Sequence, residues 1–210
     1  LDLRAWTPGR CVVHFLFVTC QMSETFPPPQ KFFWHPLFFQ NLATVALCII
    51  GAKMGLEFTI PPGYTSLLWP PAGIALGMML VYGRRLWPGI FIGGFLVNGY
   101  FSGLLNAIDI AQVFEKIASV TLITSGYTIQ TLAGHALIQR YVGVPLHLER
   151  KRQIFLLLAV LPFVVCTISA VIAQATLYGF GVTPFEDLDR GWVAWWIGDS
   201  FGMMLFTPLI

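Results

Sequence analysis

Charge is scarce in this 210-residue sequence. Only 10% of its residues are charged, whereas a soluble domain carries about 25%. Hydrophobic residues make up 56%, with 18 Phe and 7 Trp, and the mean hydropathy is +0.73. A soluble globule of this size could not bury so much apolar surface. The composition therefore excludes a soluble enzyme, a nucleic-acid-binding protein and a disordered chain, and it predicts a polytopic membrane protein.

Motifs for catalysis and metal binding are also missing. The four cysteines have no CxxC or other metal-ligand spacing, and two of them lie in apolar runs, so we expect no disulfide framework. The sequence has no HExxH motif, no P-loop, no Ser-His-Asp candidate set and no second acid inside a predicted span for a proton relay. We therefore expect no catalytic residues, no cofactor and no metal site.

Long apolar stretches are what the sequence has instead. A helix needs about 20 apolar residues to cross a bilayer, and six stretches meet this length approximately. They are residues 37–56, 67–83, 86–105, 117–139, 154–178 and 192–210. The predicted fold class is thus all-α, a transmembrane helical bundle over residues 36–210. Residues 1–35 form an N-terminal tail, and we expect residues 1–21, which precede Met22, to be a spurious or non-domain leader.

The segments between these stretches differ in charge. If the spans alternate in direction, one side of the membrane receives seven basic residues: Lys31, Arg84, Arg85, Arg140, Arg150, Lys151 and Arg152. The other side receives six acidic residues and three basic ones: Glu57, Asp109, Glu115, Glu186, Asp187, Asp189, Lys53, Lys116 and Arg190. Because basic loops stay in the cytoplasm, we predict a cytoplasmic N-terminus and a chain that returns to the cytoplasm near residue 210.

Glycine spacing and one amphipathic segment refine this picture. Pairs four residues apart let helices approach closely in lipid, and five pairs occur: Gly51/Gly55, Gly73/Gly77, Gly89/Gly93, Gly99/Gly103 and Gly198/Gly202. They predict a compact bundle. Residues 104–116 alternate apolar and polar positions at helical spacing, which suits either a short helix on the outer membrane surface or an ordinary polar loop.

Two proline-containing segments enter predicted spans. Trp69, Pro70 and Pro71 precede the second span, where proline is tolerated in the first turn of a helix and tryptophan favours the membrane interface. This segment is either a rigid helix entrance or a broken helix end that faces a binding cavity. Arg84 and Arg85 begin the turn before the third span. Positive-inside topology explains them, and a contact with lipid phosphate or with a downstream cytoplasmic domain is the alternative.

Asp199 is the only acid well inside a predicted span. A charge there costs at least about 2.5 kcal/mol, so it must be paired, protonated or facing water. It lies roughly 10 Å along its helix from Trp192, and Asn98 and Trp69 are expected at a similar depth. Together with Trp195 and Trp196, these residues form either a small-molecule pocket or a polar clamp between helices.

Several of these motifs resemble one known family. LLWPPAGIALG (67–77), YGRRLWPG (82–89), GGFLVN (93–98), WWIGD (195–199) and TPL (207–209) look like the signature of the MASE family, the bacterial membrane-associated sensor domains of the first described type. The resemblance covers about residues 40–210. Gln130 stands where the family commonly has an acid, which implies a different ligand or sensitivity if that acid takes part in perception.

The resemblance implies a multi-pass sensory input domain in the bacterial inner membrane. Such domains regulate a cytoplasmic output domain in the same chain: a diguanylate cyclase, a cyclic-di-GMP phosphodiesterase or a histidine kinase. Family members usually have about eight spans, so we expect the domain to continue beyond residue 210. This role admits a small-molecule ligand and a homodimer as partners, besides the lipid bilayer.

Two other functions stay open at this point. A small-solute transporter, or the substrate-binding membrane subunit of one, would have the same charge pattern and a similar cavity. A membrane scaffold would recruit partners through its helices. Substitution of Asp199 or Asn98 in a scaffold would change stability and nothing else.

Overall fold

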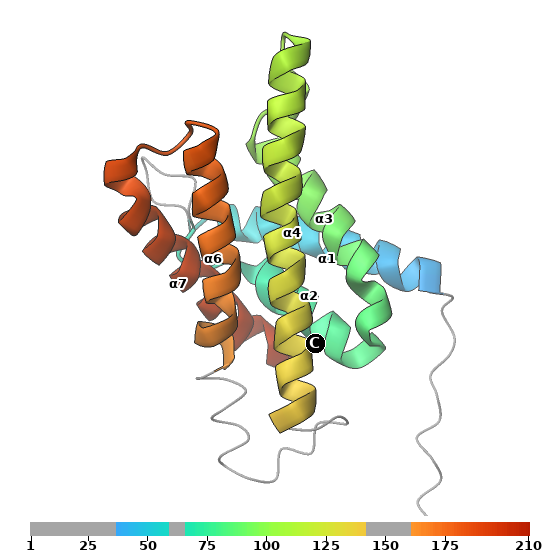
Figure 1. The fold of residues 1–210 in the computed structure, drawn as a ribbon. Helices are drawn as coiled ribbons and strands as arrows, with labels where there is room; N and C mark the ends of the chain where they lie inside the picture. The colour runs from blue at the N-terminus through green and yellow to red at the C-terminus, as the bar shows by residue number, and fades with distance from the viewer. Residues whose placement is uncertain (1–36, 59–65, 142–160) are drawn as a thin grey trace, which may run out of the picture. The chain divides into compact units, whose positions relative to one another are not determined.

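The described part of the chain is helical. The computed structural model describes residues 37–58, 66–141 and 161–210. Within them lie six α-helices (Figure 1): α1 (Leu37–Leu56), α2 (Pro70–Tyr82), α3 (Trp87–Phe101), α4 (Ile110–Tyr141), α6 (Leu161–Gly179) and α7 (Leu188–Phe206). The all-α prediction is confirmed, and each predicted span corresponds to one helix.

The helix lengths differ from those of the predicted spans. α4 has 32 residues and begins at Ile110, not at residue 117; it is about 48 Å long and exceeds the roughly 30 Å core of a bilayer. The separate surface helix considered for residues 104–116 is therefore wrong, because residues 110–116 are the first two turns of α4. Among the described helices, Leu37–Leu56 and Pro162–Gly179 are long and apolar enough to cross a membrane by themselves.

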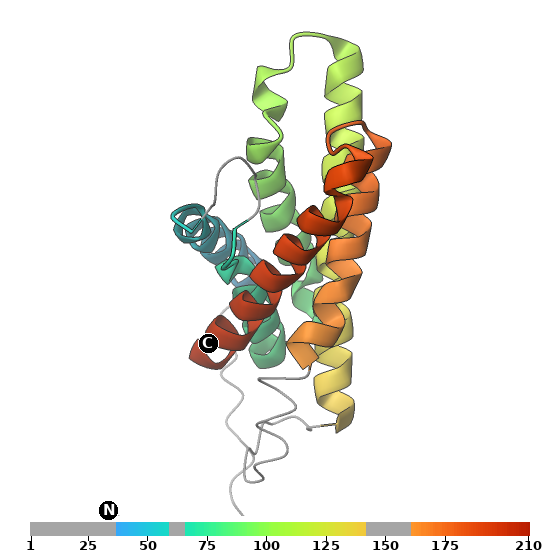
Figure 2. The ribbon, with the colours of Figure 1, turned by 90° about the vertical axis from the view of Figure 1, so that its left-hand side faces the viewer.

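Four helices run up and down in turn. Figures 1 and 2 show α3, α4, α6 and α7 alternating in direction. The turn that carries Arg84 and Arg85 lies toward the same end as the end of α4 at Arg140. The acidic turn Phe185–Asp187 and the start of α4 lie at the opposite end. This separation of basic and acidic turns agrees with the alternation that the sequence predicts.

α1 does not follow this alternation. It runs across the direction of α4 in Figure 1 and is seen nearly along its axis in Figure 2. It packs against α2 and α3. The count of six membrane spans and the cytoplasmic position of the N-terminus therefore stay predictions.

α2 is the centre of the bundle. All its residues from Pro70 to Leu80 are buried, and it contacts α1, α4 and α7. Leu76, Met79 and Ile138 lie in a cluster of buried apolar residues at the core of the bundle. In lipid this packing is held by van der Waals contact and hydrogen bonds, because the apolar tails offer the helices no hydrophobic driving force.

Most of the glycine pairs lie where helices touch. The α2 entrance is the segment just before α2 together with its first turn (residues 66–71). A Cβ on Gly51 or Gly55 would contact this entrance, and one on Gly73 would meet the carbonyl oxygen of Gly202. The pair Gly99/Gly103 is the exception, because a Cβ on Gly99 would meet only Leu104, at 3.6 Å, and Gly103 adopts a φ of 64° in a turn. The compact bundle is therefore explained by four of the five predicted pairs.

Candidate functional site

The segment before α2 lies on the glycine face of α7. The backbone N–H of Trp69 donates to the Gly198 carbonyl at 2.9 Å. A Cβ on Gly198 would meet the Ser66 carbonyl oxygen, and one on Gly202 would meet the Trp69 carbonyl oxygen. Irregular backbone at membrane depth needs hydrogen-bond partners within the protein. Here the bare backbone of α7 provides one, because two glycines four residues apart leave that face without side chains.

Ser66 fixes the same segment from its other side. Its hydroxyl lies 2.7 Å from the carbonyl oxygens of Gly55, at the end of α1, and of Leu68. The Trp69 ring packs beside Phe101 of α3 with a centroid distance of 6.0 Å. The entrance of α2 therefore touches α1, α3 and α7.

The two prolines occupy the first turn of α2, as the sequence predicts. Both are buried, and their missing N–H groups are ones that a first turn leaves unpaired in any case. The carbonyl of Pro71 accepts a hydrogen bond from the Tyr127 hydroxyl of α4 at 2.8 Å. Sequence reasoning missed Tyr127, whose buried hydroxyl joins α4 to this entrance.

Asp199 joins three helices through its carboxylate. Ser169 of α6 donates to Oδ2 at 2.6 Å, and the Gln130 amide of α4 donates to the same oxygen at 3.0 Å. The Trp195 side chain, one turn earlier on α7, lies beside the same carboxylate. Asp199 is only 3% exposed, and in the described part of the chain no basic side chain forms an ion pair with it. We call Asp199, Gln130, Ser169 and Trp195 the Asp199 cluster.

The geometry of this cluster is that of a clamp between helices. Each donor comes from within the bundle, and the carboxylate is closed off from solvent. Gln130 also keeps an unpaired amide oxygen. A ligand could donate a hydrogen bond to this oxygen, or a rotation of the Gln130 amide could bring it to another donor. Of the two readings left open by the sequence, the clamp is the one that these contacts favour.

Asn98 and Trp196 form their hydrogen bonds with groups other than Asp199. The Asn98 amide donates to Gly94 of its own helix at 2.9 Å and to Thr124 of α4 at 3.4 Å, so its hydrogen bonds join α3 to α4 and not to α7. The Trp196 indole donates to the Phe163 carbonyl of α6 at 2.7 Å. The predicted meeting of Asp199 with Asn98 is replaced by contacts with Gln130 and Ser169.

The basic topology residues are placed only in part. Arg84 and Arg85 are exposed in the 3₁₀ turn Arg84–Leu86 between α2 and α3. Arg150, Lys151 and Arg152 lie outside the described residues. A turn is present at the arginine pair, and its cytoplasmic position stays a prediction.

One comparison decides the family. The MASE1 family model matches residues 40–210. The chain belongs to the MASE1 family. Searches of curated proteins and of solved structures find no match. The resemblance predicted from the Trp-Pro-Pro-Ala-Gly and Trp-Trp-Ile-Gly-Asp segments is confirmed over the same range.

MASE1 domains are membrane-associated sensor domains of signalling proteins. This region is accordingly a sensory module of the membrane and not a catalytic one. Two of the segments that carried the resemblance, WPPAG and WWIGD, meet in space through the hydrogen bond from Trp69 to Gly198. The WPPAG entrance of α2 lies on the glycine pair of the MASE1 α7 helix, one helical turn or less from Asp199.

Proposed function

We propose that this MASE1 domain perceives its signal through a change in the position of α7. Two sets of contacts hold this helix: the Asp199 cluster toward α4 and α6, and the glycine face toward the α2 entrance. Trp69, Pro70, Pro71, Asn98, Gln130, Trp195, Trp196 and Asp199 are the proposed sensing residues. The output is a cytoplasmic diguanylate cyclase, cyclic-di-GMP phosphodiesterase or histidine kinase domain.

The observation that carries this proposal is the buried carboxylate on α7. A charge without a cationic partner is costly in a membrane domain and marks function more often than stability. Its hydrogen bonds to α4 and α6 can exchange when the helices shift. A signal biases this equilibrium only if it interacts differently with the two packings, and a clamp on the moving helix provides such a difference.

The sharpest test replaces Asp199 by asparagine in the full-length protein. We expect normal membrane insertion and a changed basal output or dose response, because the amide keeps the size of the side chain but not its charge. The readout is the product of the output domain, measured with and without the signal. Gly99→Ala, at a position with room for a Cβ, serves as the control. An Asp199→Asn response equal to that of the wild type would contradict the proposal.

The coding sequence that follows the codon for Ile210 separates sensing from transport. A helix leading into a cyclase, phosphodiesterase or kinase domain supports the sensory proposal. A stop codon beside genes for an ATPase would favour a transporter subunit instead.

The proposed orientation places the Arg84–Arg85 turn in the cytoplasm of a bacterial inner-membrane protein. Single cysteines at Arg85 and Asp187, both exposed, test it after Cys11 and Cys20 are replaced by serine. We expect a membrane-impermeant maleimide to label Asp187→Cys in intact spheroplasts and Arg85→Cys only after lysis. The native Cys48 and Cys166 are buried. Labelling in the opposite order would overturn the orientation.

A further inference from the structure

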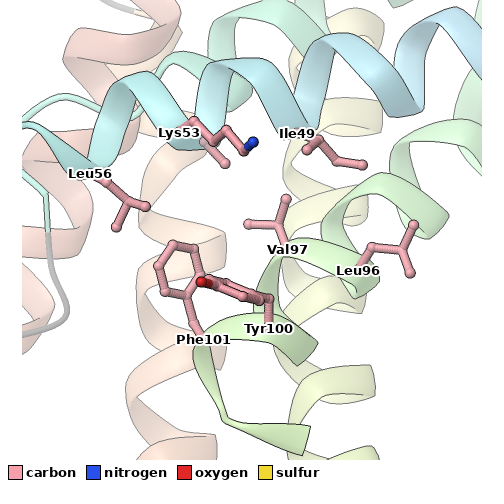
Figure 3. A pocket seen from close by; sticks show the side chains of 8 residues that line it. Ile49, Lys53, Leu56, Leu96, Val97, Tyr100 and Phe101 are labelled. Carbon is pink, nitrogen blue, oxygen red and sulfur yellow. The ribbon is translucent and has the colours of Figure 1, made fainter. Parts of the chain in front are cut away.

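A groove of about 310 Å³ lies between α1 and α3 (Figure 3), and no residue of the Asp199 cluster lines it. Ile49 and Leu56 of α1 line one wall, and Leu96 and Val97 of α3 line the other. Its volume is at the lower end of the range of small-molecule sites, about 300–1,000 Å³. Since MASE1 is a membrane domain, an apolar groove on its surface is open to lipid chains.

Two polar groups reach this groove. The Lys53 ammonium group and the Tyr100 hydroxyl both lie on its walls in Figure 3. No carboxylate lines it, and within the described residues Lys53 forms no ion pair, not even with Glu57 one turn further along α1. An unpaired ammonium group beside apolar side chains is unfavourable in a membrane unless an anion or water reaches it. The groove therefore combines one positive charge with an apolar channel.

We propose that this groove binds one anionic phospholipid. An acyl chain lies along the apolar walls of α1 and α3, and the headgroup phosphate accepts charge-assisted hydrogen bonds from Lys53. Charge complementarity decides this occupant. A second groove, between α4 and α6, is lined by residues such as Leu122 and Val171 and contains no charged residue, so it has no preference for an anionic headgroup.

The groove is connected to α7 through two successive contacts. Phe101, at its edge, packs on the Trp69 ring, and the Trp69 backbone is bonded to Gly198 of α7. A bound lipid thus lies two contacts from the helix that the sensory proposal makes mobile. This regulatory consequence rests on the proposed function, whereas lipid binding itself does not.

Native mass spectrometry of the purified full-length protein tests the binding. The protein in detergent is mixed with equal amounts of phosphatidylglycerol and phosphatidylcholine. We expect one retained phosphatidylglycerol per chain, preferred about fivefold, which is the effect of one basic residue near an anionic headgroup. Lys53→Gln should lower the preference to twofold or less. Arg190→Gln removes a charge from an exposed pair with Asp187 and should leave the phosphatidylglycerol preference unchanged.

A steric pair of variants separates the groove from the general lipid surface. Leu96→Trp should fill the groove and reduce retention of both lipids, whereas Leu122→Trp in the second groove should not alter the phosphatidylglycerol preference. Their native side chains are 50% and 48% exposed, so both variants are expected to fold. The lipid site would be overturned if Lys53→Gln and Arg190→Gln lost the phosphatidylglycerol preference equally. It would also be overturned if Leu96→Trp did not change lipid retention.

A soluble competitor distinguishes a lipid from a free anion. Glycerol phosphate in excess should not displace phosphatidylglycerol, because it lacks the chain that fills the groove. Displacement would overturn the proposal in favour of a headgroup-sized anion. Lipid preference is measured without any signalling output. The lipid site can therefore be supported when the Asp199→Asn test contradicts the sensory proposal, and the sensory proposal can be supported when the lipid test fails.

Discussion

Replacement of Gly202 by alanine is expected to destabilise the bundle by about 3 kcal/mol. The added Cβ would meet the carbonyl oxygen of Trp69, and a Cβ on the facing Gly73 would in turn meet the carbonyl of Gly202. Both neighbours are backbone atoms, so no rotamer change relieves the overlap. α7 and the α2 entrance would have to separate, which removes the hydrogen bond from Trp69 to Gly198.

The thermal midpoint of the detergent-solubilised protein measures this effect. We expect a large fall in the midpoint for Gly202→Ala and a smaller yield of monodisperse protein. Gly99→Ala is the matched control, since its Cβ would meet only the Leu104 side chain, at 3.6 Å, and alanine favours a helix over glycine. If the two variants melt at the same temperature, the close approach of α2 and α7 is not as described.

Replacement of Asp199 by leucine is expected to lower the free energy of unfolding by about 2 kcal/mol or more. The charge is removed, but the Gln130 amide and the Ser169 hydroxyl then lose their shared acceptor inside the bundle. A buried donor without a partner costs about 1–3 kcal/mol. The variant is compared with the wild type by its thermal midpoint in the same detergent.

A triple variant shows whether unpaired donors cause that loss. Asp199→Leu with Gln130→Leu and Ser169→Ala removes the donors together with the acceptor, and it should recover at least half of the lost stability, because replacing all partners by apolar groups is nearly neutral. Signalling should remain changed in this variant. A triple variant less stable than Asp199→Leu would show that packing volume, not hydrogen bonding, governs the site.

The features that depend on local sequence were predictable. A proline pair after Trp69 determines where α2 begins, because proline fits only the first turn of a helix. The apolar stretches located six helices, and the arginine pair after Gly83 located a turn. Helix ends were less accurate, since α4 continues to Ile110 through polar residues that a hydropathy pattern assigns to a loop.

The partners of Asp199 could not be read from the chain in the same way. Depth along a helix suggested Asn98, but depth does not give the rotation of a helix about its axis, and Asn98 turns to Thr124 instead. Ser169 had one signal that could have found it: it is one of the few polar residues of a mainly apolar stretch, the others being Thr167, Gln174 and Thr176.

The sequence by itself determined that this is a helical membrane domain of the MASE1 type, where its described helices and the Arg84–Arg85 turn lie, and that one acid, Asp199, needs a partner. These follow from composition, periodicity and short motifs, each of which acts within a few neighbouring residues. Only the tertiary structure decided that α1 crosses the other helices, that Gln130 and Ser169 hold Asp199, and that two glycines of α7 receive the backbone before α2. Each of these depends on how helices rotate and tilt against one another, and that is set by packing between residues far apart in the chain.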